Sequence, residues 1–436
     1  MKKPTEGRPR GATRARMAAA LLAGVLAGAC SLDKTNPNAP SEEQVLGGSE
    51  GIITLAVGLQ GQYADTVNTF LRAPELVTDE WGTRPVALAA DQSLVNGNPD
   101  PTFGVVSDPF GAAYRIARTA DILIASSGSA EVGLGTGLRA GISSLSKLFK
   151  AMAIGNLTLQ YQALPAGAGP GQLPLPRAQV QDTVIALLES ARADLLSVPD
   201  SSLNGFRSRV LGSGINLPNT IDAMLARYYL FRGRYSDALT AAQRVSPTVL
   251  SQLTYPNPGL NPVYNYSAVA RYTGARKSFF TEAAPGDQRP SYWAIRTAGQ
   301  PGLPDSVFDF RKFGARNDPY PLYLPDEMTL IQAEVYARQG NLPQARALVN
   351  AVHTDAVAQV DEPVAGLPAL TDAQLATEAD ILAQILYERR YELFAQGVRW
   401  EDLRRLRPYT AKRPSIEFLP YPQSECDVNP ANPCNK

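Results

Sequence analysis

The chain has 436 residues, of which 44% are hydrophobic and 19% are charged, so it can bury a substantial core and is not disordered. The formal net charge is zero, but residues 1–29 hold six basic residues and one acidic residue. The rest of the chain has 35 basic and 40 acidic residues, a net charge of −5. Because no basic excess is available to neutralise phosphates, nucleic acid is excluded as an expected partner.

Residues 1–29 are expected to be a signal peptide. A basic stretch precedes an apolar run from Met17 to Ala29, which suits a signal-peptide core but is too short to span a bilayer. The run ends in "LAGAC", which resembles a bacterial lipobox and makes Cys30 the lipidated first residue of the mature chain. The small residues before Cys30 also fit an ordinary cleavage site, so simple secretion is the alternative.

Residues 30–40 are polar and contain proline, and we expect them to tether residues 41–436, a single folded domain. Cys426 and Cys434 lie close together in "CDVNPANPC", and an oxidising compartment would let them pair and leave Cys30 as the odd thiol. No C-x-x-C spacing occurs and His353 is the sole histidine. Neither a metal site nor a cofactor is therefore predicted.

Helical patterns begin soon after the tether. Ser41 and Gln44 fit a capping box. Helical spacing then covers a face from Ile52 to Tyr63, and three further stretches at residues 110–125, 145–164 and 182–196. The stretch "PELVTDEWGTRP", which contains Trp81, and the residues up to Asp108 are predicted to be irregular.

Two later segments share the spacing Y-x3-G-x4-A. In tetratricopeptide-like helix pairs the glycine ends the first helix, and the small alanine lets the second helix pack closely. An unrelated helical hairpin is the alternative, because three positions can coincide by chance. The two sets are Tyr229, Gly233 and Ala238, and Tyr336, Gly340 and Ala345.

Residues 254–323 separate these two pairs and hold 13 of the 34 aromatic residues, without helical periodicity. We expect a long irregular insertion that carries function. Aromatic rings can cover the apolar faces of a sugar while polar neighbours bind its hydroxyls, although a loop aromatic can instead fill the local core. The predicted ligand-binding residues are Asp79, Trp81, Tyr264, Asn265, Tyr266, Trp293, Arg296 and Tyr320.

A dense charged segment, "YERRYELFAQGVRWEDLRRL", runs from Tyr387 to Leu406. Tyr387, Tyr391, Phe394 and Val398 recur at helical spacing, and Gly397 supplies a backbone that can end the helix. Charge runs on helices usually face water. The segment is therefore predicted to be a solvated, salt-bridged helix whose aromatic edge packs on its neighbours and closes the bundle.

The same segment carries a family resemblance. The pattern E-R-x-x-E-L-x-x-x-G-x-R-x-x-D-L-x-R, from Glu388 to Arg405, resembles the C-terminal signature of the SusD/RagB family. "EMTLIQAEVYARQGNLPQARALVNAVH" resembles that family's penultimate helix pair, and "GDQRP" lies where its D-x-R motif is usually found. The lipobox, the tether and "LFKAMAIGNLTLQYQALP" agree in order.

The resemblance implies a mainly α fold, a SusD-like helical bundle of tetratricopeptide-like pairs with irregular inserts. It also implies a lipid-anchored, cell-surface outer-membrane protein of a Gram-negative bacterium. Such a protein captures a glycan or peptide nutrient and delivers it to a SusC-like TonB-dependent transporter.

Two other classes of function stay open at this point. A lipid-anchored helical-repeat scaffold for outer-membrane proteins would explain the helix pairs but not the aromatic insertion. A glycoside hydrolase needs two suitably spaced carboxylates, for which Asp79 with Glu80 or Asp305 with Asp309 could serve. His353 shows no obvious partner in the sequence, and we predict no catalytic residues and no enzyme activity.

Overall fold

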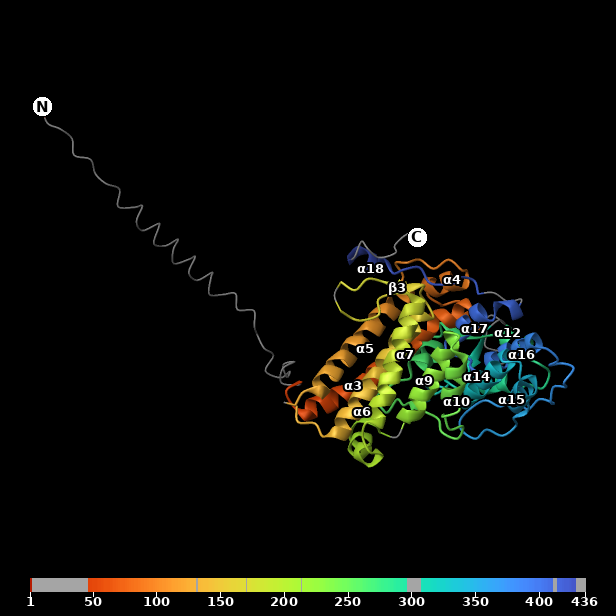
Figure 1. Ribbon diagram of the computed structural model, residues 1–436. Helices are drawn as coiled ribbons and strands as arrows, with labels where there is room; N and C mark the ends of the chain where they lie inside the picture. The colour runs from red at the N-terminus through yellow and green to blue at the C-terminus, as the bar shows by residue number, and fades with distance from the viewer. Residues whose placement is uncertain are drawn as a thin grey trace.

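The computed structural model describes Met1 and residues 46–130, 132–169, 171–212, 214–295, 307–410 and 414–428. Its long helices are α3 (Ser49–Val77), α5 (Gly104–Gly128), α6 (Thr136–Thr158), α7 (Arg177–Leu196), α9 (Leu217–Phe231), α10 (Tyr235–Ala242), α14 (Pro325–Arg338), α15 (Leu342–Thr354) and α16 (Glu378–Glu392). Each packs mainly on helices close to it in this order, so the array runs from α3 to α16 across the molecule (Figure 1). The predicted mainly α fold is confirmed.

Shorter elements fill the spaces between these helices. The helices are α4 (Ala89–Val95), α8 (Asn204–Phe206), α11 (Pro262–Tyr264), α12 (Lys277–Thr281), α13 (Arg289–Trp293), α17 (Arg399–Arg405), α18 (Gln423–Val428), η1 (Asp200–Leu203), η2 (Arg207–Leu211), η3 (Asn265–Val269) and η4 (Arg407–Tyr409). The strands are β1 (Trp81–Thr83), β2 (Ala163–Leu164), β3 (Leu175–Pro176), β4 (Gln252–Leu253), β5 (Thr273–Arg276), β6 (Ala294–Ile295), β7 (Val307–Phe310) and β8 (Tyr320–Pro321).

The strands form one four-stranded antiparallel sheet of order β1-β5-β7-β6 and two small two-stranded antiparallel sheets, β2-β3 and β4-β8. In the larger sheet, Trp81 pairs with Ala275 and Ala275 pairs with Phe308. This sheet joins the turn after α3 to three strands of the aromatic insertion. Two regions far apart in the sequence thus lie side by side.

The two predicted helix pairs are present as α9–α10 and α14–α15, and α10 packs against α14. Gly233 and Gly340 follow the first helix of each pair with φ of 70° and 78°, a conformation that glycine adopts without strain. Ala238 and Ala345 are fully buried where the second helix packs on the first. The shared spacing therefore marks two real helix pairs.

The other predicted helices differ from the observed ones in where they begin and end. The periodic stretches at 110–125 and 182–196 lie inside α5 and α7, whereas α6 ends at Thr158 and residues 159–164 form a turn and β2. Helix α3 extends through Pro74 to Val77, so the start of the predicted irregular stretch is helical. Ser41, Gln44 and the tether lie outside the described residues.

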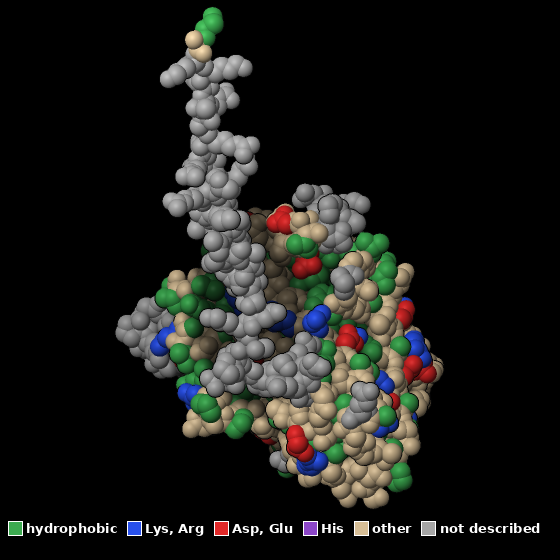
Figure 2. All heavy atoms as spheres, turned by 90° about the vertical axis from the view of Figure 1, so that its left-hand side faces the viewer, with side chains coloured by type: hydrophobic (Ala, Val, Ile, Leu, Met, Phe, Trp, Pro, Cys, Tyr) green, Lys and Arg blue, Asp and Glu red, His purple; other side chains and the backbone are tan. Residues whose placement is uncertain are grey.

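The exterior of the array mixes both signs of charge. On the face shown in Figure 2, acidic and basic side chains lie interspersed among apolar and uncharged ones. Within the described part of the chain, no helix has both the length and the apolar character needed to cross a membrane.

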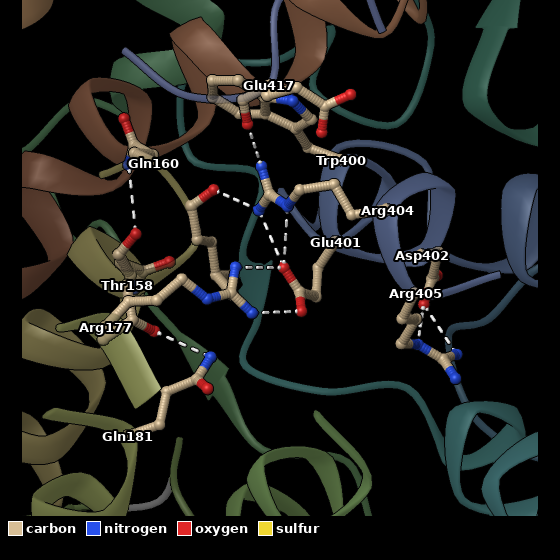
Figure 3. Close-up of polar contacts among 12 residues, drawn as sticks. Thr158, Gln160, Arg177, Gln181, Trp400, Glu401, Asp402, Arg404, Arg405 and Glu417 are labelled. Atoms are coloured by element: carbon tan, nitrogen blue, oxygen red, sulfur yellow. Dashed lines mark hydrogen bonds and ion pairs between the residues drawn. The ribbon is translucent and has the colours of Figure 1, made fainter. Parts of the chain in front are cut away.

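The charged segment is a helix as predicted, but the prediction that its charges face water is wrong. Glu388, Arg389 and Glu392 on α16, and Glu401 and Asp402 on α17, are all buried. The helices around them supply opposite charges, which periodicity within the segment does not reveal. Figure 3 shows one such group, in which Glu401 accepts two hydrogen bonds from Arg177 of α7, at 2.6 and 2.9 Å.

The next turn of α17 completes this arrangement (Figure 3). Arg404 donates to Glu401 at 2.8 Å and to the backbone oxygens of Leu159 and Glu417 at 2.6 and 2.7 Å. Its guanidinium carbon lies 5.0 Å from the centre of the Trp400 ring, in cation–π contact. A single arginine therefore joins α17 to the end of α6 and to the C-terminal segment.

Replacing Asp402 by asparagine is expected to destabilise the fold by about 3–5 kcal/mol, because it leaves the buried Arg389 and the half-buried Arg405 without their shared carboxylate. Asp402 accepts from Arg389 at 2.8 Å and from Arg405 at 2.8 and 3.1 Å. Urea unfolding of the variant checks this value. The matched control is Asp372→Asn, whose carboxylate is 90% exposed beside Arg346 and should change stability by less than about 1 kcal/mol.

The ion pairs of Asp402 also make the stability of the fold depend on pH. Burial opposes ionisation of Asp402, but Arg389 and Arg405 outweigh it and lower the pKa of this carboxyl. The stabilisation is therefore present above the unfolded-state pKa of about 4 and is lost as the pH falls through the lower folded-state pKa. Equal stabilities of the wild type and Asp402→Asn at neutral pH would contradict the assignment.

Candidate functional site

Four of the aromatic rings among the predicted ligand-binding residues lie in the core. Trp81 and Trp293 are 0% exposed, and Tyr266 and Tyr320 are also buried. These four rings are therefore not available at the surface, and the alternative left open by the sequence, that a loop aromatic fills the local core, applies to them. The insertion has no helical stripe of its own, so its aromatic side chains fill the space between the sheet and α16.

The contacts of each ring show this packing role. The Trp293 indole N–H donates to the backbone oxygen of Tyr391 at 2.7 Å, and the Tyr320 hydroxyl donates to the backbone oxygen of Ala395 at 3.0 Å. Trp81 packs against Phe310 with ring centres 5.1 Å apart. The polar tips of Trp293 and Tyr320 find backbone partners and the Tyr266 hydroxyl donates to the Asp91 carboxylate, as expected of core aromatics. Among the described residues, the Trp81 indole N–H has no hydrogen-bond partner.

The remaining predicted residues are scattered. Tyr264 is half-buried on α11, and Asn265 is exposed at the start of η3. Asp79 forms an ion pair with Arg276, which ties the turn after α3 to β5. Arg296 lies outside the described residues, as do Cys30 and Cys434.

The side chains proposed for other chemistry have structural partners. Glu80 is buried and accepts from Arg390 at 2.9 Å, while Asp309 pairs with Arg84. Asp305 lies outside the described residues. His353 has a partner that the sequence did not reveal, since its Nδ1 lies 2.7 Å from a carboxylate oxygen of Glu388.

Cys426 is disulfide-bonded. Because Cys434 lies outside the described residues, the pairing of these two cysteines stays a prediction.

A cleft of about 730 Å³ lies at the edge of the insertion, beside α13. Its walls combine one aromatic ring with side chains of both charges and with amide and hydroxyl groups. The lining residues are Gly286, Asp287, Gln288, Ser291, Tyr292, Arg311, Lys312, Asp318, Asp361, Glu362 and Val364. A concave site with one ring and many hydrogen-bonding groups suits a polar ligand that has an apolar face.

Tyr292 is the aromatic residue of this cleft. It precedes Trp293 at the end of α13, and since neighbouring residues of a helix point in different directions, burial of Trp293 leaves Tyr292 at the surface of the cleft. Its hydroxyl donates to Asp361 at 2.9 Å. Lys312 pairs with the same carboxylate and lies 5.6 Å from the ring centre. These contacts hold the ring in one orientation.

Arg289 holds Asp287, one of the residues that line the cleft, in place from below. It is fully buried and donates to Asp287 at 2.7 Å, to Glu388 at 2.6 Å and to Glu392 at 2.9 Å. Burial alone would lower the pKa of Arg289, but the three carboxylates raise it, so the guanidinium stays charged. The D-x-R motif thus consists of Asp287, which lines the cleft, and the arginine that joins it to α16.

Glu362 forms part of the cleft wall. Its side chain comes from the loop after α15, it is 6% exposed, and one oxygen accepts from the backbone N–H of Gln359 at 3.3 Å. Burial, with a contribution from Asp326, raises the pKa of Glu362 to about 7. A carboxyl group in this state changes its charge near neutral pH.

Sequence reasoning missed most of this site. Tyr292 was one of the 13 aromatics of the insertion, but Asp361 and Glu362 lie outside it, in a loop that showed no motif. The usable signal was "GDQRP", because only Ser291 separates this D-x-R stretch from Tyr292 and Trp293.

Known proteins share this architecture. Residues 305–417 match the model of the SusD family. The chain also superposes on a SusD superfamily protein of Bacteroides thetaiotaomicron with a TM-score of 0.68, at 17% identity over 88% of this chain and 99% of that one. The chain thus has the SusD fold, and residues 305–417 match the SusD family. A search of curated proteins finds no match to its sequence.

Two further solved structures share the SusD fold. NanU of B. fragilis superposes with a TM-score of 0.65, at 16% identity over 90% of this chain and 98% of that one. A SusD-like carbohydrate binding protein of Bacteroides vulgatus gives a TM-score of 0.63, at 15% identity over 82% and 83% of the two chains. At these identities the SusD fold is shared, while ligand contacts have to be argued from this chain's own residues.

Truncating the buried indole of Trp293 should destabilise the fold. Trp293→Ala is expected to destabilise the protein by about 3–5 kcal/mol through cavity formation. Tyr292→Ala, at the neighbouring half-buried position, should destabilise it by less. Urea unfolding of the two variants checks the order. A Trp293→Ala protein as stable as the wild type would mean that the indole does not fill the core.

Proposed function

We propose that this protein is a SusD-family member that binds glycans at the cell surface, with the Tyr292 cleft as the binding site. The observation that carries the proposal is the combination, in one cleft, of a half-buried ring with carboxylate, amide, hydroxyl and guanidinium groups at its edge. A ring covers the apolar face of a sugar, and the polar groups bind its hydroxyls. The match of residues 305–417 to the SusD family and the shared fold with a SusD-like carbohydrate binding protein support the same function.

The protein is further proposed to be anchored to the outer membrane through a lipid on Cys30 and to deliver its ligand to a SusC-like TonB-dependent transporter. The signal peptide, the lipobox-like sequence and the family support this role.

Glycan binding can be tested by titrating the purified mature protein with a panel of oligosaccharides and peptides in a calorimeter. We expect weak binding of at least one oligosaccharide, because an open cleft buries little of the ligand. Tyr292→Ala should weaken that binding about fivefold to tenfold through loss of the stacked face. Binding of peptides alone would overturn the proposal.

Tyr264→Ala is the matched control for this experiment. Tyr264 is a half-buried tyrosine of the same insertion that does not line the cleft. Its truncation should leave the affinity unchanged. If Tyr264→Ala weakened binding and Tyr292→Ala did not, the ligand would bind near α11 instead of in the cleft.

The proposed lipid anchor is tested by replacing Cys30. Wild-type protein expressed with its leader in a Gram-negative host should incorporate labelled palmitate and sediment with membranes, whereas Cys30→Ala should do neither. Wild-type protein that is unlabelled and soluble outside the cell would instead support simple secretion.

A further inference from the structure

One carboxyl group of the cleft has an unused oxygen. Only 6% of the surface of Glu362 is exposed, yet the residue lines the cleft. Among the described residues, its Oε2 atom has no hydrogen-bond partner, and no lysine or arginine nitrogen lies within ion-pairing distance of its carboxylate. A buried polar atom without a partner is costly. Of the described glutamates whose Oε2 lacks a partner, Glu362 alone lines the cleft, which makes this oxygen a position for a ligand group.

The charges around Glu362 favour a cation there. The Arg289 guanidinium is shared by three carboxylates, Lys312 pairs with Asp361, and Arg311 donates to the backbone oxygen of Ser291. Acidic groups exceed basic ones among the charged residues that line the cleft or pack beneath it. These residues are Asp287, Asp318, Asp326, Asp355, Asp361, Glu388, Glu392, Arg289, Arg311, Lys312 and His353.

We propose that the Glu362 carboxylate accepts a protonated amine of the ligand, so that the cleft selects glycans containing unacetylated amino sugars. This inference rests on the proposed function. A hydroxyl group would complete the hydrogen bond of Oε2 but would leave the buried negative charge uncompensated, whereas an ammonium group satisfies both. An acetylated amine offers an N–H donor without charge and carries extra bulk, so it should bind less well.

Binding should also displace a proton. With its pKa raised to about 7 by burial, Glu362 is mainly neutral one pH unit below that value. An ammonium group favours the ionised carboxylate, so binding at that pH should release up to about one proton from Glu362. Titrations in buffers of different ionisation enthalpy measure this number, and the Glu362→Gln protein should release none from this position.

The test compares a glucosamine tetrasaccharide with its fully N-acetylated counterpart by calorimetry. Wild-type protein should bind the amine form about tenfold more tightly, as expected for one charged hydrogen bond. Glu362→Gln should bring the two affinities within about twofold of each other and should fold normally, because it removes a buried charge. Thermal unfolding checks the folding. Glu425→Gln, at a half-buried carboxyl outside the cleft, is the matched control and should keep the preference.

Equal affinities of the wild type for both tetrasaccharides would overturn the amine proposal and leave glycan binding standing. An amine preference that survives Glu362→Gln would overturn the assignment to this carboxylate. Absence of binding to every oligosaccharide of the panel would instead contradict the proposed function, and the two failures are thus distinguishable.

Discussion

The position of the cleft depends on a guanidinium that water does not reach. Arg289 sits between the loop that carries Asp287 and the helix that carries Glu388 and Glu392, and it bonds to all three carboxylates. A buried charge is tolerated only when its hydrogen bonds are completed by groups in the right places. The three carboxylates therefore fix where α13 lies against α16, and α13 in turn carries both Tyr292 and Trp293.

The same rule extends along the charged segment. Arg390 pairs with Glu80 of the turn after α3, and Glu401 pairs with Arg177 of α7. Each bond joins segments that are more than 200 residues apart in the sequence. Apolar packing is not directional, whereas a buried ion pair has one geometry in which both partners are satisfied. The segment thus sets the register in which the early helices meet the late ones, and its charge density follows from that task.

This arrangement explains which predictions from the sequence succeed. Helix periodicity and the glycines at 233 and 340 are local signals, because a residue's place on a helix and a left-handed turn depend on the nearest residues alone. Whether a face meets water is decided elsewhere in the chain. The charges of α16 and α17 are buried because their partners Glu80, Arg289 and Arg177 come from other elements, and no pattern within the segment shows this.

The cleft shows the same limit of prediction from sequence, here for apolar residues that were expected at the surface. The abundance of aromatic residues in the insertion suggested a surface for stacking, but an irregular backbone also needs a core, and rings such as Trp81 and Trp293 supply it. Tyr292 is left as the one ring among the described residues that line the cleft. A ligand there gains one stacking contact, while the remaining contacts come from charged and polar groups around it. Since stacking discriminates poorly among sugars and buried carboxylates discriminate strongly by charge, the selectivity of the cleft resides in its loop residues, above all Glu362.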